Sequence, residues 1–215
     1  MPFGDFRGRF ISIEGVDNTG KSTICADIKA FLEKEGNKVT FVNDPPMVEP
    51  WKSWKETITG SHDLMTPARA MLFLAGRLDA VSRIIRPAQE RKETVLADRF
   101  IDSWFAYQLN AFEKFMSKED SYNLLLALHK TLLSSGLLVE PDRTYLIIGE
   151  VEKVAKRGKD KTPSVYDDIG TQAAIQANFL WLAERFGRDR IRILKLDGKT
   201  SREMVEEIRR DLAEG

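Results

Sequence analysis

One short segment restricts the fold more than any other part of the chain. The apolar run Phe10–Glu14 leads directly into Gly-Val-Asp-Asn-Thr-Gly-Lys-Ser, residues 15–22. In the pattern Gly-x-x-x-x-Gly-Lys-Ser, the glycines let successive backbone N–H groups point inward, and the helix that follows adds the positive end of its dipole. The segment therefore predicts a phosphate-binding P-loop between a strand and a helix.

The P-loop assigns expected roles to its residues. Lys21 is expected to reach the terminal phosphates, and the Ser22 hydroxyl to bind magnesium. The rest of the loop is expected to surround the phosphates with backbone N–H groups. The predicted triphosphate site comprises Gly15, Val16, Asp17, Asn18, Thr19, Gly20, Lys21, Ser22 and Thr23.

The rest of the chain alternates short apolar segments with longer amphipathic ones. The predicted strands are Phe10–Glu14, 38–42, 94–97, 144–148 and 191–196, and the predicted helices are 21–35, 51–58, 66–91, 103–109, 121–134, 150–157, 170–186 and 201–212. This alternation predicts an α/β fold with a parallel sheet covered by helices on both faces. A length of 215 residues with 42% hydrophobic composition is consistent with one domain spanning residues 1–215.

Composition narrows the possible partners. The 33 Lys and Arg residues balance the 33 Asp and Glu residues, so no overall basic field favours nucleic acid or an anionic membrane. No segment has the length of a membrane span, and we expect a soluble, cytoplasmic protein. The single cysteine, Cys25, is interpreted as a small core residue, and His62 and His129 as structural or exposed residues.

A second polar site is predicted at the end of another strand, in Val95-Leu96-Ala97-Asp98-Arg99-Phe100. Carboxyl ends of parallel strands form the ligand-binding edge of such sheets. There Asp98 could hold magnesium through water, and the fork of Arg99 could grip a second anionic substrate such as a monophosphate. The alternative for Arg99 is a surface salt bridge.

The pattern resembles the thymidylate kinase family of nucleoside monophosphate kinases. The resemblance lies in the segments 10–23, T-P-A-R-A-M-L-F-L-A-G-R (66–77), 85–100 with its D-R-F motif, D-S-W-F-A-Y-Q (102–108) and E-P-D-R-T-Y-L-I (140–147). It implies a P-loop NTPase three-layer sandwich with a five-stranded parallel sheet and a short lid, here about residues 152–168. It also implies transfer of the γ-phosphate of ATP to dTMP with Mg²⁺, and a homodimer.

The resemblance also implies roles for particular residues. Phe73 is expected to stack on the thymine ring, and Arg77 to bind the edge of the base. Arg99 is expected to hold the acceptor phosphate, and Asp17 to contact the sugar 3′-hydroxyl. The other residues expected to bind dTMP are Ser103, Tyr107 and Gln108.

The chain departs from the family pattern after the second predicted strand. An Arg-Glu-Pro-Gly-like stretch is usual there, whereas this chain has Asn43-Asp44-Pro45-Pro46. The continuation is similar to deoxynucleoside kinases, in which an acidic residue deprotonates a sugar hydroxyl, and Asp44 would be that base. A deoxynucleoside kinase and a non-catalytic nucleotide-binding module therefore remain as alternatives.

The lid is expected to supply a catalytic cation. Asn18 is uncharged at a P-loop position where many family members carry arginine, so charge compensation has to come from elsewhere. The segment 152–162 is rich in basic residues, and we expect Arg157 to take this role, with Lys161 as second choice.

Overall fold

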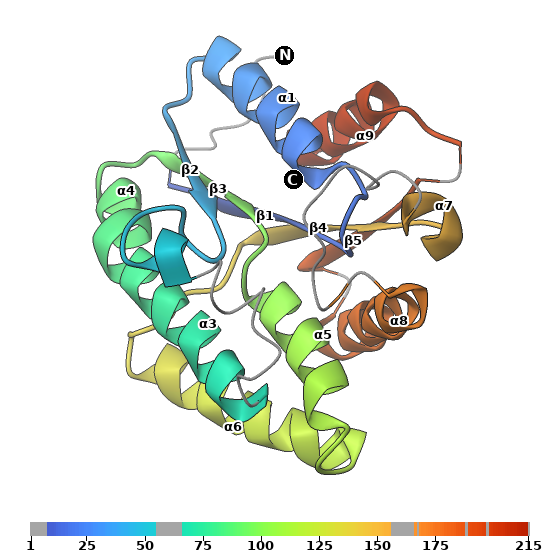
Figure 1. The fold of residues 1–215 in the computed structure, drawn as a ribbon. Coiled ribbons are helices and arrows are strands. Elements are labelled where there is room, and N and C mark those ends of the chain that lie inside the picture. The colour runs from blue at the N-terminus through green and yellow to red at the C-terminus, as the bar shows by residue number, and fades with distance from the viewer. Residues whose placement is uncertain are drawn as a thin grey trace.

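A computed structural model describes residues 8–54, 66–155, 166, 168–187, 189–196 and 198–214. In this part of the chain, five parallel strands form one sheet in the order β2-β3-β1-β4-β5 (Figure 1). They are β1 (Phe10–Glu14), β2 (Val39–Asn43), β3 (Thr94–Asp98), β4 (Arg143–Ile148) and β5 (Ile191–Lys195). The predicted five-stranded parallel sheet is confirmed, and every predicted strand boundary lies within one residue of the observed one.

Helices cover both faces of the sheet and make three layers (Figure 1). One face carries α1 (Lys21–Lys34) and α9 (Ser201–Glu214), which pack against each other. The opposite face carries α3 (Thr66–Ala80), α4 (Arg86–Glu90), α5 (Ile101–Phe112) and α8 (Ile169–Phe186), with α6 (Lys118–Ser134) packed on α5 and the short α7 (Val151–Ala155) beside α8. The three-layer architecture is therefore as predicted.

Two of the three inner strands, β1 and β3, are buried along their whole length, as a parallel strand between two helical layers should be. Cys25 of α1 is also fully buried, which confirms its interpretation as a core residue. His129 of α6 is buried and its Nε2 lies 2.8 Å from Oε1 of Glu140, so its role is structural. His62 lies outside the described residues.

The helix predicted over residues 66–91 contains a turn that the sequence analysis did not predict. Between α3 and α4 the chain makes one π-helical turn, Val81–Ile85, just before Pro87. Proline has no N–H and its ring clashes with the carbonyl four residues earlier, and a wider turn relieves that conflict.

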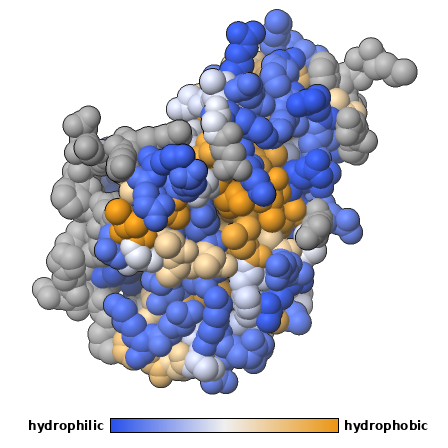
Figure 2. Space-filling model, turned by 90° about the vertical axis from the view of Figure 1, so that its right-hand side faces the viewer, coloured by the Kyte–Doolittle hydropathy of each residue, from blue (hydrophilic) through white to orange (hydrophobic). Residues whose placement is uncertain are grey.

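Among the described residues, the strand β5 forms one edge of the sheet and bonds only to β4. A groove along it is lined by Ile191, Ile193 and Leu194, with the cations Arg192 and Lys195 beside them. Figure 2 shows this side of the molecule, where a hydrophobic area lies between hydrophilic borders. Charged side chains on an edge strand hinder pairing with other chains.

Strand register brings the predicted site residues together. Ile13 of β1 is paired with Asp98 of β3, and Asn43 of β2 is paired with the same Asp98. The P-loop, the Asp98–Arg99 turn and the segment after β2 therefore leave the sheet side by side.

Candidate active site

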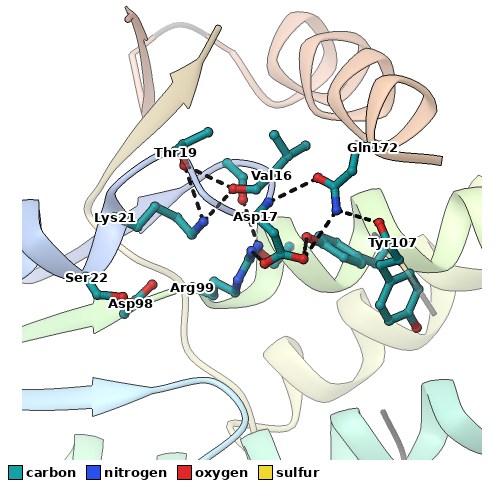
Figure 3. Close-up of polar contacts among 12 residues, drawn as sticks. Val16, Asp17, Thr19, Lys21, Ser22, Asp98, Arg99, Tyr107 and Gln172 are labelled. Atoms are coloured by element: carbon teal, nitrogen blue, oxygen red, sulfur yellow. Dashed lines mark hydrogen bonds and ion pairs between the residues drawn. The ribbon is translucent and has the colours of Figure 1, made fainter. Parts of the chain in front are cut away.

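The P-loop is curled around its own lysine (Figure 3). Nζ of Lys21 donates to the carbonyl oxygen of Val16 at 2.6 Å and lies 3.3 Å from Oγ1 of Thr19, which itself donates to the same carbonyl at 3.0 Å. Gly15 has φ 138°, and a Cβ there would lie 2.4 Å from the carbonyl oxygen of Ile147. Only glycine fits at this position, because the loop passes directly against β4.

Lys21 is buried at the start of α1. Burial, and then the positive charge of Arg99, lower the pKa of Lys21 to about 7. Its internal contacts are with neutral oxygens, which are weaker partners for a cation than phosphate oxygens. The loop thus holds a cation that an anion would stabilise.

Ser22 of α1 and Asp98 of β3 are in direct contact. Oγ of Ser22 donates to Oδ2 of Asp98 at 2.6 Å. A hydroxyl beside a carboxylate supplies the hard oxygen ligands that Mg²⁺ prefers, and this ion usually keeps several waters and takes only one or two protein ligands. The donor set therefore fits magnesium, although no group of three metal-ligating side chains occurs among the described residues.

Arg99 binds the P-loop from the adjoining strand end. Its Nη1 donates to the carbonyl oxygen of Gly15 at 2.7 Å, and its Nη2 donates to Oδ1 of Asp17 at 2.5 Å. Its guanidinium carbon lies 5.1 Å from the ring centroid of Tyr107. Arg99 is thus not the exposed surface salt bridge considered above.

Asp17 is the meeting point of these contacts. Burial alone would raise its pKa, but the charges of Arg99 and Lys21 outweigh burial and lower the pKa of Asp17 to about 2. The hydroxyl of Tyr107 lies 3.4 Å from Oδ2 of Asp17. A carboxylate that stays ionised at neutral pH can accept a hydrogen bond from a sugar hydroxyl.

The helices α3 and α5 form the other wall of the site. Arg77 is buried with 2% exposure, its guanidinium carbon 5.4 Å from the ring centroid of Phe100 and 6.0 Å from that of Trp104. Phe73 lies one turn earlier on α3 and is half-buried. Gln108 lies one turn after Trp104 on α5 and is also buried.

Arg77 and Gln108 on this wall have three buried polar atoms without a hydrogen-bond partner among the described residues. They are Nε and Nη1 of Arg77 and Oε1 of Gln108. Buried polar atoms are normally satisfied, and exceptions need a cause such as an absent ligand. Two donors and one acceptor are therefore available for a polar planar molecule.

Asp44 forms a buried ion pair with Arg77. Its side chain is 5% exposed, and its backbone N–H donates to the carbonyl of Asp98 at 3.2 Å. Because Asp44 is buried and paired with Arg77, it is poorly placed to act as a base that deprotonates a sugar hydroxyl.

Two contributors to the site were missed in the sequence analysis. Gln172 of α8 accepts the backbone N–H of Asp17 at 3.2 Å, and its Nε2 lies 3.3 Å from Oδ2 of Asp17 (Figure 3). Glu14, the residue just before the P-loop, accepts hydrogen bonds from the backbone N–H of Phe100 and the hydroxyl of Ser103. Gln172 lies 155 residues from its partner, and no local pattern marks it. Glu14 did have a signal, since an acid in an apolar strand is unusual.

The expected lid cations lie outside the described residues. The helix α7 ends at Ala155, so the structure does not describe Arg157 or Lys161. The end of the lid segment is described at Tyr166, whose carbonyl accepts a hydrogen bond from Nε2 of Gln172 at 2.6 Å and whose ring centroid is 5.0 Å from that of Tyr107.

Comparison with known proteins identifies the family of the chain. The family model described as thymidylate kinase matches residues 13–208. The chain belongs to the thymidylate kinase family. The family resemblance seen in the sequence is thereby confirmed, and the match includes the P-loop, both walls of the site and α8.

Relatives within the thymidylate kinase family cover most of the chain. The thymidylate kinase of Bifidobacterium longum (strain NCC 2705) is 36% identical over 184 residues, which cover 82% of this chain and 84% of that protein. That of Kosmotoga olearia is 31% identical over 204 residues, covering 92% and 91%. The solved structure of thymidylate kinase from Candida albicans has a TM-score of 0.77 at 26% identity, covering 94% of this chain and 89% of that one.

Within the described residues, every helix is too short or too polar to cross a membrane.

Proposed function

We propose that this chain transfers the γ-phosphate of ATP to dTMP and so forms dTDP and ADP. The observation that carries the proposal is the juxtaposition of two basic side chains, Lys21 in the P-loop and Arg99 directly after β3, whose charges both lower the pKa of Asp17. Two phosphates bound by these cations would face each other across Asp17.

Different residues of the chain bind the donor, the acceptor and the metal in this proposal. Lys21 and the loop N–H groups bind and orient the donor phosphates, and Arg99 holds the acceptor phosphate in line. Ser22 and Asp98 would hold Mg²⁺, which when bound supplies neutralisation of the charge on the phosphates. No general base is required, because the acceptor oxygen of a monophosphate is already an anion.

The wall between α3 and α5 fits a thymine base. Arg77 offers donors and Gln108 offers an acceptor, and the base edge carries the complementary pair, a C4 carbonyl beside an N3–H. Cytosine presents an amino donor and a ring acceptor at these places, so it would leave the protein groups unpaired. We therefore expect dTMP and dUMP to be accepted and dCMP to be rejected.

The ion pair of Asp44 with Arg77 disfavours the deoxynucleoside kinase alternative. That reaction needs a base beside the 5′-hydroxyl, and Asp44 lies instead beside the arginine assigned to the base edge. The complete P-loop, with Lys21 and Ser22 in place, disfavours a non-catalytic module.

A homodimer and a cytoplasmic location belong to the same proposal. Apolar side chains stand exposed on two outer helices, Met71 on α3 at 44% and Leu124 on α6 at 48%, and a second copy could cover them. Sedimentation analysis of the purified chain tests the dimer.

A coupled assay with ATP and Mg²⁺ tests the function. We expect turnover with dTMP and none with thymidine. Asp44→Asn should retain measurable dTMP turnover with a raised dTMP KM, because it loosens Arg77. Turnover with thymidine that Asp44→Asn abolishes would establish the deoxynucleoside kinase instead, and absence of any turnover would favour the binding module.

A further inference from the structure

Glu14 is a buried carboxylate that the proposed reaction does not use. It is the last residue of β1, its exposure is 0%, and the P-loop begins at the next residue. Burial, and then the negative charge of Asp102, raise the pKa of Glu14 to about 7. Burying an ionisable carboxyl group costs free energy, so the hydrogen bonds that Glu14 makes are expected to compensate for that cost.

Both carboxylate oxygens of Glu14 bind the turn that carries Arg99. Oε1 accepts the backbone N–H of Phe100 at 2.7 Å, and Oε2 accepts the hydroxyl of Ser103. Phe100 is the N-cap of α5, and Ser103 lies in its first turn. Glu14 thus ties the strand before the P-loop to the helix after Arg99.

The turn needs this support because its backbone is strained. Arg99 has φ 69°, in the left-handed region that is unfavourable for a non-glycine residue. Such a conformation persists only where neighbours hold it. Here the N–H of Arg99 donates to the carbonyl of Ile13 at 3.0 Å, and the next N–H, that of Phe100, donates to Glu14.

The second contact orients the side chain of Arg99. A serine hydroxyl has one proton, and Ser103 donates it to Glu14. Its oxygen lone pairs are then free to accept Nη1 of Arg99, which lies 3.2 Å away. The carboxylate therefore acts on the guanidinium through the hydroxyl.

We propose that Glu14 is a positioning residue for the acceptor phosphate. It holds the Arg99 turn and the Ser103 hydroxyl so that the guanidinium is oriented before the monophosphate arrives, and it does so without touching either nucleotide. This inference rests on the proposed function, in which Arg99 binds the acceptor.

The variant Glu14→Gln tests it. Glutamine can still accept the N–H of Phe100 through its oxygen, but its amide then donates to Ser103, whose proton must turn toward Arg99. We expect the KM for dTMP and its dissociation constant by calorimetry to rise about ten-fold or more, with the KM for ATP changed less than two-fold. The matched control is Asp142→Asn, which removes another carboxylate bonded to a β1 backbone N–H, that of Phe10 at 2.6 Å, at the opposite end of the strand. It should change neither KM.

A double-mutant cycle with Ser103→Ala tests the route. In the Ser103→Ala background, Glu14→Gln should raise the dTMP dissociation constant by much less than it does alone. Equal rises for ATP and dTMP, or full additivity with Ser103→Ala, would overturn the inference. If Glu14→Gln does not fold, Glu14→Asp, which is too short to reach both partners, should show the same split, and failure of both to fold would assign Glu14 to the fold alone.

The outcomes separate this inference from the proposed function. Wild-type protein that does not bind dTMP would overturn the function. Wild-type protein that binds dTMP no better than Glu14→Gln would overturn only the role of Glu14.

Discussion

We expect Lys21 to bind phosphate but to lower the stability of the ligand-free protein. We expect Lys21→Met to lower kcat at least 100-fold and yet to raise the unfolding temperature at pH 7 by a few degrees. The reason is that methionine removes a buried cation whose pKa is lowered to about 7. Calorimetric melting and steady-state assays measure the two effects. Lys29→Met, an exposed site on the same helix, should change neither appreciably, whereas near-normal turnover of Lys21→Met would refute the P-loop assignment.

Arg99 is expected to affect the two substrates unequally. Arg99→Ala removes the proposed acceptor cation, so the KM for dTMP should rise roughly 100-fold. The KM for ATP should also rise, by less than ten-fold, because the carbonyl of Gly15 and the carboxylate of Asp17 lose a partner. Initial-rate measurements with each substrate varied decide this, and equal changes would make Arg99 a structural residue.

At the level of single residues, the sequence predicted those that belong to contiguous motifs. Lys21 and Ser22 follow β1 through the P-loop, and Asp98 and Arg99 lie at the carboxyl end of β3, so their proximity could be inferred from the topology of a parallel sheet. The Asp44–Arg77 pair and Gln172 could not be inferred, because their partners are distant in sequence and their residue types are common on surfaces.

At the level of elements, the P-loop depends on its close approach to β4. We expect Gly15→Ala to destabilise the protein by more than about 2 kcal/mol and to abolish ATP binding, since its Cβ would overlap the backbone carbonyl of Ile147. Gly36→Ala is the matched control: its φ is 86° but nothing lies within 4 Å of the new Cβ. It should cost only about 1 kcal/mol by urea unfolding and leave ATP binding intact. A similar cost for both variants would contradict the role of the contact with β4.

Elements with strong periodicity were predictable, and their ends were less so. The helix expected from Ser121 begins at Lys118, because Ser117 caps it by accepting the N–H of Asp120 at 3.1 Å. The helix expected from Ser103 begins at Ile101, because Phe100 is held by Glu14. The first of these caps is visible in the sequence, and the second depends on a contact made only in the folded chain.

For the molecule as a whole, the shifted pKa values of Glu14 and Lys21 predict a minimum in the free energy of unfolding near pH 7 in the absence of nucleotide. The folded state keeps the Glu14 proton up to about pH 7, whereas an unfolded glutamate loses it near 4.5, so stability falls between these values. Folded Lys21 loses its proton near pH 7, whereas an unfolded lysine keeps it to about 10.5, so stability rises again above pH 7. Urea unfolding from pH 5 to pH 9 measures the profile.

Two variants test the contributions of Glu14 and Lys21 to this pH profile separately. Glu14→Gln should flatten the fall below pH 7, and Lys21→Met should flatten the rise above it. Slopes on the order of 1 kcal/mol per pH unit are expected where one group titrates. A wild-type profile that rises steadily from pH 5 to pH 7 would contradict the assignment for Glu14.

The strand order has a consequence for how the chain is made. β1 is synthesised first but lies in the middle of the sheet, and its partners β3 and β4 begin at Thr94 and Arg143. At about 5–20 residues per second, ribosomes need several seconds to translate from Phe10 to Thr94. During that time β1, which leads into the P-loop, is an unpaired apolar stretch on a nascent chain. Its burial awaits translation of the later strands, so the sheet around β1 can form only late in synthesis.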